Sequence, residues 1–129
     1  SDSTKKYNIK NISYGLKEIM KLRPVTYKLK GTNYQDIGFL AQEVKSILPE
    51  IVYGEEGQMT LSYGQMTSVL TKAIQEQQKI IDNQQSEISS LTKGFLAEQL
   101  ENENLTAQIS LLTAKMEKLE EIFGTKAEK

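Results

Sequence analysis

The sequence has no histidine and no cysteine among its 129 residues, and only two prolines. Without histidine and cysteine, a chain cannot form a Ser-His or Cys-His nucleophile, a disulfide, an iron–sulfur cluster or a structural zinc site. We therefore expect no cofactor and no bound metal. Lysine is the side chain that remains to act as the base for a serine nucleophile near neutral pH.

Long apolar runs and strongly basic clusters are also missing. No run of 18 apolar residues and no signal peptide is present, so we expect this chain neither to span a membrane nor to direct its own export. The 16 basic and 17 acidic side chains nearly cancel, and no basic cluster is interleaved with aromatic residues, so nucleic-acid binding is not expected. Residues 1–52 are net basic and residues 53–129 are net acidic, which favours two structural parts.

The first part, residues 1–63, has the pattern of a small α+β domain. Apolar residues at helical spacing, alternating runs, and Pro or Gly at the boundaries define its elements. The predicted elements are an extended polar arm over 1–11, a helix over 13–22, strands over 25–29 and 36–40, a helix over 41–48, and a hairpin of 51–53 with 59–61. A domain of about 60 residues is near the lower limit for folding alone, so we expect it to need partners.

The second part, residues 64–129, predicts a long helix that forms a coiled coil. With Ile74 at position a, the heptad continues in phase to Phe123 without a proline. The a positions are Ile74, Ile81, Ile88, Phe95, Asn102, Ile109, Met116 and Phe123, and the d positions are Gln77, Gln84, Leu91, Glu98, Leu105, Leu112 and Leu119. The alternative is a single amphipathic helix folded onto the front domain, but that domain offers too little surface to cover it.

The flanking positions of the heptad favour three strands. Ile at a with Leu at d usually favours a dimer. However, the e positions before Glu120 are all Gln or Thr, and Ile80 and Ile122 occupy g positions, where a dimer normally carries charges. Uncharged flanks imply a wider buried stripe, so we predict a homotrimer.

The middle of the coil is predicted to be its weakest part. Gly94 costs about 1 kcal/mol relative to Ala in a helix, Glu98 places a carboxylate at d, and Asn102 stands at a. One interpretation is a polar layer that fixes the register, and another is a bend at Gly94 that folds the chain back into a bundle. Leu96 and Leu100 form an outward apolar patch that favours either the bend or contact with another protein.

The first six residues place Ser1 five positions before Lys6. If Ser1 is a nucleophile, we expect the chain to be the product of a cut immediately before it. The alternative is an ordinary boundary followed by solvated lysines. In an extended arm, residues an odd number apart point to opposite faces, so pairing Ser1 with Lys6 requires a turn that the spacing does not supply.

Several short motifs follow one another in a defined order and spacing. They are SDSTKK at 1–6, NIKNI at 8–12, LKEIMKLRPVTY at 16–27, IGFLAQEV at 37–44, LPEIV at 48–52, LSY at 61–63 and AIQEQQ at 73–78. Together they resemble the intramolecular chaperone auto-processing domain, the chaperone of endosialidase, found at the C-terminus of phage tailspikes and fibres. A related self-cleaving module occurs in the myelin regulatory factor. The resemblance covers about residues 1–82.

The resemblance implies a homotrimeric chaperone that assembles an upstream β-rich client domain of the same polypeptide and then cuts itself off. Ser1 matches the family's nucleophile and Lys6 its general base, with Asp2 as a possible supporting residue. The family often has an arginine where this chain has Thr4, which leaves the role of a neighbouring basic residue open, and Lys5 competes with Lys6 as the base. For a phage protein, the expected location is the host cytoplasm during virion assembly, with release from the mature particle.

Two further interpretations stay open on the sequence. One is a non-enzymatic trimerisation or attachment domain that remains on its fibre, and the other is a processed transcription-factor oligomerisation module. The ordinary pKa of a lysine amine is about 10.4, so a lysine base requires burial or nearby cations to act at pH 7. Trimerisation would supply this by burying the arm between subunits.

Overall fold

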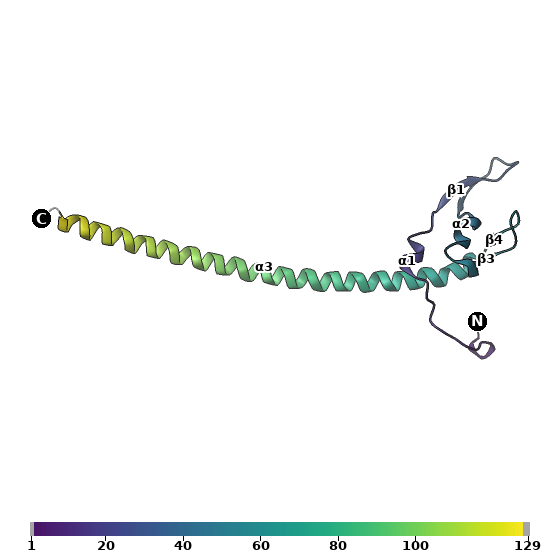
Figure 1. Cartoon of the computed structure of the whole chain (residues 1–129), viewed down its shortest axis with the longest axis horizontal. Coiled ribbons are helices and arrows are strands. Elements are labelled where there is room, and N and C mark those ends of the chain that lie inside the picture. Colours follow the sequence, from purple (N-terminus) through teal and green to yellow (C-terminus); the bar gives the residue numbers. More distant parts are fainter. Residues whose placement is uncertain (1, 128–129) are drawn as a thin grey trace. The chain divides into compact units, whose positions relative to one another are not determined.

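The computed structural model describes residues 2–127. The elements follow in the order η1 (Ser3–Lys5), α1 (Leu16–Ile19), β1 (Val25–Lys28), β2 (Gln35–Gly38), α2 (Ala41–Lys45), η2 (Pro49–Ile51), β3 (Val52–Tyr53), β4 (Thr60–Leu61) and α3 (Tyr63–Ala127) (Figure 1). The chain divides into two compact units, Ser1–Asp82 and Asn83–Lys129.

The first unit contains two small antiparallel sheets, each made of one hairpin. Strand β1 pairs with β2 so that Val25 lies opposite Gly38, and β3 pairs with β4 so that Val52 lies opposite Leu61. The second hairpin needs glycine at its turn. Gly54 has φ +84°, and a Cβ there would lie 2.6 Å from the Gln58 carbonyl oxygen.

The core of the first unit joins α2 and η2 to the beginning of α3. Its buried apolar side chains among the described residues are Val44, Leu48, Ile51, Met66, Val69 and Ala73. Met66, Val69 and Ala73 are spaced three and four residues apart, so they lie on one face of α3. The first turns of the long helix are therefore part of the globular unit, which continues to Asp82.

The predicted combination of a small mixed domain and a long helix is confirmed. The hairpin predicted over 51–61 forms, whereas the helix predicted over 13–22 is limited to Leu16–Ile19. The strand predicted over 36–40 ends at Gly38, because Leu40 becomes the N-cap of α2. The predicted division between residues 63 and 64 coincides with the start of α3 rather than with the end of the compact unit.

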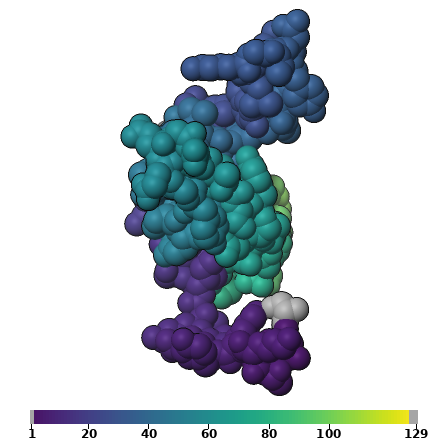
Figure 2. Space-filling model, turned by 90° about the vertical axis from the view of Figure 1, so that its right-hand side faces the viewer, coloured from purple at the N-terminus to yellow at the C-terminus, as the bar shows by residue number. Residues whose placement is uncertain are grey.

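An exposed arm and an exposed hairpin extend from the first unit. The arm precedes α1, and the hairpin consists of β1 and β2. Figures 1 and 2 show them at opposite ends of this unit, with the core between them. Tyr7 and Ile9 in the arm are 94% and 71% exposed, so these two apolar side chains contribute little buried surface.

In the second unit, α3 continues past Gly94 as one uninterrupted helix (Figure 1). Its a and d side chains have no partner within the described part of this unit and are exposed, as Ile109 at 63% and Phe123 at 67% illustrate. Helices in proteins are stabilised mainly by packing of an apolar face. A single copy of this helix, with its apolar stripe in water, therefore lacks the packing that would stabilise it.

Candidate functional site

The chain turns immediately after its first residue. The 3-10 helix η1 spans Ser3–Lys5, and Asp2 caps it because its Oδ1 accepts a hydrogen bond from the Thr4 N–H at 2.9 Å. At the other end, the Lys6 N–H donates to the Ser3 carbonyl oxygen at 3.0 Å. The extended geometry expected for the arm is therefore replaced here by a turn.

This turn brings together Asp2, Lys5 and Lys6, which are all exposed. The hydrogen bond from Thr4 lowers the pKa of the Asp2 carboxyl, because it stabilises the charged form. Ser1 lies outside the described residues, so its pairing with Lys6 stays a prediction. The roles predicted for Lys5 and Asp2 in the reaction also stay predictions.

The arm is attached to the body of the first unit at Tyr14–Leu16. The Tyr14 hydroxyl donates to Glu50 Oε1 at 2.9 Å, and this bond raises the pKa of the tyrosine. The backbone N–H of Gly15 donates to Glu18 Oε2 at 3.1 Å, and that of Leu16 donates to Glu76 Oε2 at 2.9 Å. Two carboxylates thus accept hydrogen bonds from the first N–H groups of α1, which have no partner inside the helix.

Glu76 connects segments that are sixty positions apart in the sequence. It lies on α3, its side chain is 37% exposed, and Lys72 Nζ lies 3.5 Å from its Oε1. The pKa of Glu76 is lowered, mainly by the hydrogen bond from the Leu16 N–H and further by Lys72. The carboxylate is therefore the form that holds the arm.

The lowered pKa of Glu76 predicts a pH dependence of stability. A glutamate whose pKa is lower in the folded state stabilises the fold above its ordinary value of 4.5. That contribution is lost as the pH falls through the folded-state pKa. We expect thermal melting between pH 3 and pH 7 to show a smaller pH dependence in Glu76→Gln than in the unmodified protein. Parallel melting curves for the two proteins would contradict this.

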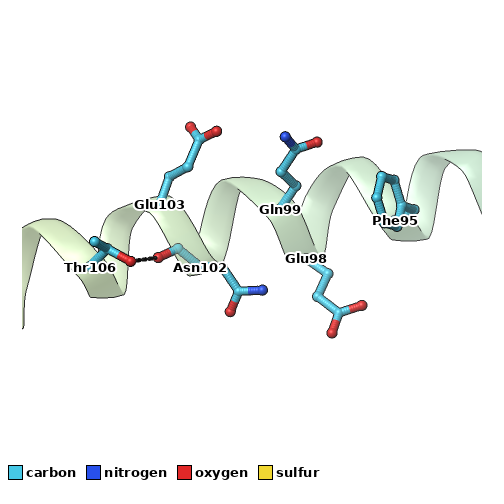
Figure 3. A pocket seen from close by; sticks show the side chains of 6 residues that line it. All are labelled: Phe95, Glu98, Gln99, Asn102, Glu103 and Thr106. Atoms are coloured by element: carbon cyan, nitrogen blue, oxygen red, sulfur yellow. Dashed lines mark hydrogen bonds between the residues drawn. The ribbon is translucent and has the colours of Figure 1, made fainter.

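The middle of α3 presents polar side chains at heptad core positions. Figure 3 shows Glu98 and Asn102 on one side of the helix and Gln99 and Glu103 on the other. The first pair occupies d and a, next to Phe95 at the preceding a position. The Thr106 hydroxyl does not add to this polar surface, since it donates to the Asn102 carbonyl oxygen at 2.8 Å.

Within residues 2–127, no group of three or more Asp or Glu side chains is placed to hold a metal ion. No helix in the described part of the chain is long and apolar enough to cross a membrane.

A comparison with protein families gives one result. Residues 1–53 match the model of a peptidase family described as chaperone of endosialidase. Over these 53 of its 129 residues, the chain is similar to that family. The match begins at the Ser-Asp pair, includes η1 and the attachment point of the arm, and ends with β3. No curated protein matches closely enough to add to the assignment.

The residues that hold the arm were not predicted from the sequence. Glu18 stands three residues after Gly15, the spacing at which a glutamate caps a helix start, so this signal was available. The turn at Ser3–Lys5 also had a signal, because Asp side chains often accept hydrogen bonds from the N–H two residues later. No local sequence pattern indicated the role of Glu76, since its hydrogen bond to Leu16 depends on tertiary structure.

Proposed function

We propose that this chain is a trimeric, C-terminal intramolecular chaperone that assists the folding of an upstream β-rich fibre or tailspike domain and then releases itself. The release is self-cleavage immediately before Ser1, with Ser1 as the nucleophile and Lys6 as the base. The observation that carries the proposal is the family match at residues 1–53, in the same chain as an exposed heptad stripe on α3. For a phage protein, assembly would take place in the host cytoplasm.

The side chains that flank the stripe support three strands. The hydroxyls of Thr92, Thr106 and Thr113, all at e positions, donate to the carbonyl oxygens of the residues four positions earlier at 2.8, 2.8 and 2.9 Å. A threonine with this bond can be buried beside the core without leaving an unpaired hydroxyl. Uncharged and internally bonded e positions suit the wider interface of a trimer.

The cut proceeds as an acyl transfer followed by hydrolysis. Ser1 Oγ bonds to the carbonyl carbon of the preceding residue, the C–N bond to Ser1 breaks, and the lysine carries the hydroxyl proton to the departing amine. The product is an ester on Ser1. Water then hydrolyses this ester, which leaves a carboxylate on the upstream fragment and restores the Ser1 hydroxyl.

The exposed turn explains why cleavage would follow assembly. Lys5 and Lys6 are solvent-exposed in the single chain, and a lysine base needs desolvation to work near neutral pH. Packing of the arm against neighbouring subunits would provide it. An unassembled client would then keep its chaperone, and an assembled one would lose it.

The proposed chaperone activity has an entropic basis. Three associated coils hold three client chains at a high effective concentration, which lowers the cost of starting an intertwined β-structure. Removal of the template by cleavage then makes assembly irreversible. The survival of the product would depend on its barrier to unfolding.

The test is to express the chain together with its natural upstream segment. We expect two fragments on a denaturing gel, a mass-spectrometric N-terminus at Ser1, and a released fragment that sediments at three times the chain mass of 14.6 kDa. A monomeric fragment at micromolar concentration would contradict the trimer. An uncut precursor in a correctly assembled trimer would contradict the cleavage.

The second candidate is a non-enzymatic trimerisation or attachment domain that stays on its fibre. The exposure of the turn favours it, because the described single chain supplies no buried environment for a lysine base. This second candidate predicts the same trimeric mass on sedimentation. It differs in predicting that the mature assembly contains full-length, uncut chains.

A further inference from the structure

The bond between Glu76 and Leu16 is placed where the arm leaves the body of the first unit. Residues 2–13 precede this point and are exposed, while Gly15 is buried. Together with the Tyr14–Glu50 hydrogen bond, this bond helps to fix the point from which the arm, with its Asp2–Lys6 turn, leaves the body. Glu76 belongs to α3, so the long helix takes part in holding the arm.

Gly15 has no space for a side chain at this attachment. A Cβ on Gly15 would lie 2.3 Å from Glu76 Oε2, the same oxygen that accepts the hydrogen bond from Leu16. That oxygen ends a flexible side chain, so an alanine would displace the carboxylate and leave the backbone in place. Glycine at position 15 thus allows the carboxylate to occupy the position in which it accepts the Leu16 hydrogen bond.

Glu76 also lies in the first heptad of the coil. Ile74 and Gln77, at positions a and d, stand on either side of it, and Ile74 is 64% exposed in the single chain. Ile81 at the next a position is 48% exposed. Partner helices that cover these isoleucines would pack against the same turns of α3 that carry Glu76.

We infer that Glu76 is a positioning residue for self-cleavage, which couples formation of the coil to placement of the reactive arm. This inference rests on the proposed function. The carboxylate would act through the Leu16 N–H and not on the reacting atoms. It holds the Leu16 N–H, so that the arm starts from one position on the surface of the assembled subunit.

The expected effect follows from the sensitivity of catalysis to geometry. A displacement of about 1 Å by a change far from the reacting atoms can reduce a rate about 100-fold. We therefore expect Glu76→Ala to slow cleavage by roughly 10- to 100-fold in precursors that still form trimers. Gly15→Ala should slow cleavage in the same way, although it removes no carboxylate.

A conservative variant separates positioning from general structural damage. Glu76→Gln keeps an oxygen that can accept the Leu16 hydrogen bond, although a neutral acceptor forms a weaker bond. We expect its cleavage rate to be restored to within about fivefold of the unmodified precursor. Glu117→Ala, at an exposed b position of the same helix, is the matched control and should cut at the unmodified rate.

The experiment follows the loss of full-length precursor with time for each variant, and the mass of the assembled species by ultracentrifugation. Slow cutting in trimeric Glu76→Ala and Gly15→Ala, with rescue in Glu76→Gln, supports the inference. An unmodified rate in Glu76→Ala or in Gly15→Ala overturns it. Loss of the trimer in both Glu76→Ala and Gly15→Ala also overturns it, because Glu76 would then act in assembly.

Failure of this inference can be distinguished from failure of the proposed function. If the unmodified precursor assembles but does not cut, the proposed self-cleavage fails. If it cuts and all four variants cut equally well, the proposed function stands and only the role of Glu76 is removed.

Discussion

Ser1→Ala is expected to leave the precursor uncut while trimer assembly continues. Alanine removes the oxygen that would bond to the upstream carbonyl carbon, so the acyl transfer cannot begin. We expect the cleavage rate to fall by at least about 1,000-fold, as is common when a nucleophile is removed. The measurement is the fraction of full-length precursor on a denaturing gel over time.

Ser3→Ala is the matched control for Ser1, since it removes the nearest other hydroxyl, at the start of η1. It should cut at close to the unmodified rate. If Ser1→Ala cuts as fast as the unmodified protein, Ser1 is not the nucleophile. If Ser3→Ala alone abolishes cutting, the reacting serine has been assigned to the wrong position.

The adjacent lysines allow the base to be assigned in the same experiment. Loss of a general base slows a reaction by roughly 10²- to 10⁴-fold, so Lys6→Ala should fall in that range and Lys5→Ala should not. The two residues share charge and exposure and are adjacent, since Lys5 ends η1 and Lys6 is its C-cap. The reverse result would transfer the role to Lys5.

Leu112→Ala is expected to dissociate the trimer at concentrations where Leu111→Ala leaves it intact. In the single chain the two leucines are 60% and 58% exposed, so they are equivalent by exposure. They differ in heptad position, because Leu112 is at d and Leu111 is at c. In a trimer, only Leu112 would point to the shared core.

The expected difference in trimer stability between the two variants is large, because each trimer contains three copies of the substituted residue. A buried Leu→Ala change costs about 2–5 kcal/mol per chain, whereas a surface change usually costs within about 0.5 kcal/mol. Sedimentation equilibrium over a range of concentrations would measure both variants. An equal or larger effect of Leu111→Ala would show that the chains associate through another face of α3.

The fold could be predicted from the sequence wherever local signals agreed with tertiary structure. Glycines at 54 and 57 marked the second hairpin, and the absence of proline after Pro49 allowed one long helix. The helix expected over 13–22 became shorter because Gly15 begins it and the chain turns again at Met20. The apolar residues before and after α1, Tyr14 and Leu22, still pack against the core from irregular segments.

The candidate site was predicted only in part. Ser1 and Lys6 were predicted as the reactive pair from their spacing and from the family resemblance, and this pairing stays a prediction because Ser1 lies outside the described residues. The turn at Ser3–Lys5 was not predicted. The attachment of the arm was missed because it joins Leu16 to Glu76, and no periodicity relates residues so far apart in the sequence. Contacts of this kind follow from how the core packs, which local patterns do not encode.

The position of the core has a practical consequence for anyone who shortens this protein. Three of the six buried apolar side chains in the described chain, Met66, Val69 and Ala73, belong to α3. A fragment that stops at residue 63 would lack half of the hydrophobic interior and would misfold or aggregate. A truncation after Asp82 retains all six together with the whole compact unit, so it would allow the globular portion to be studied without its stalk.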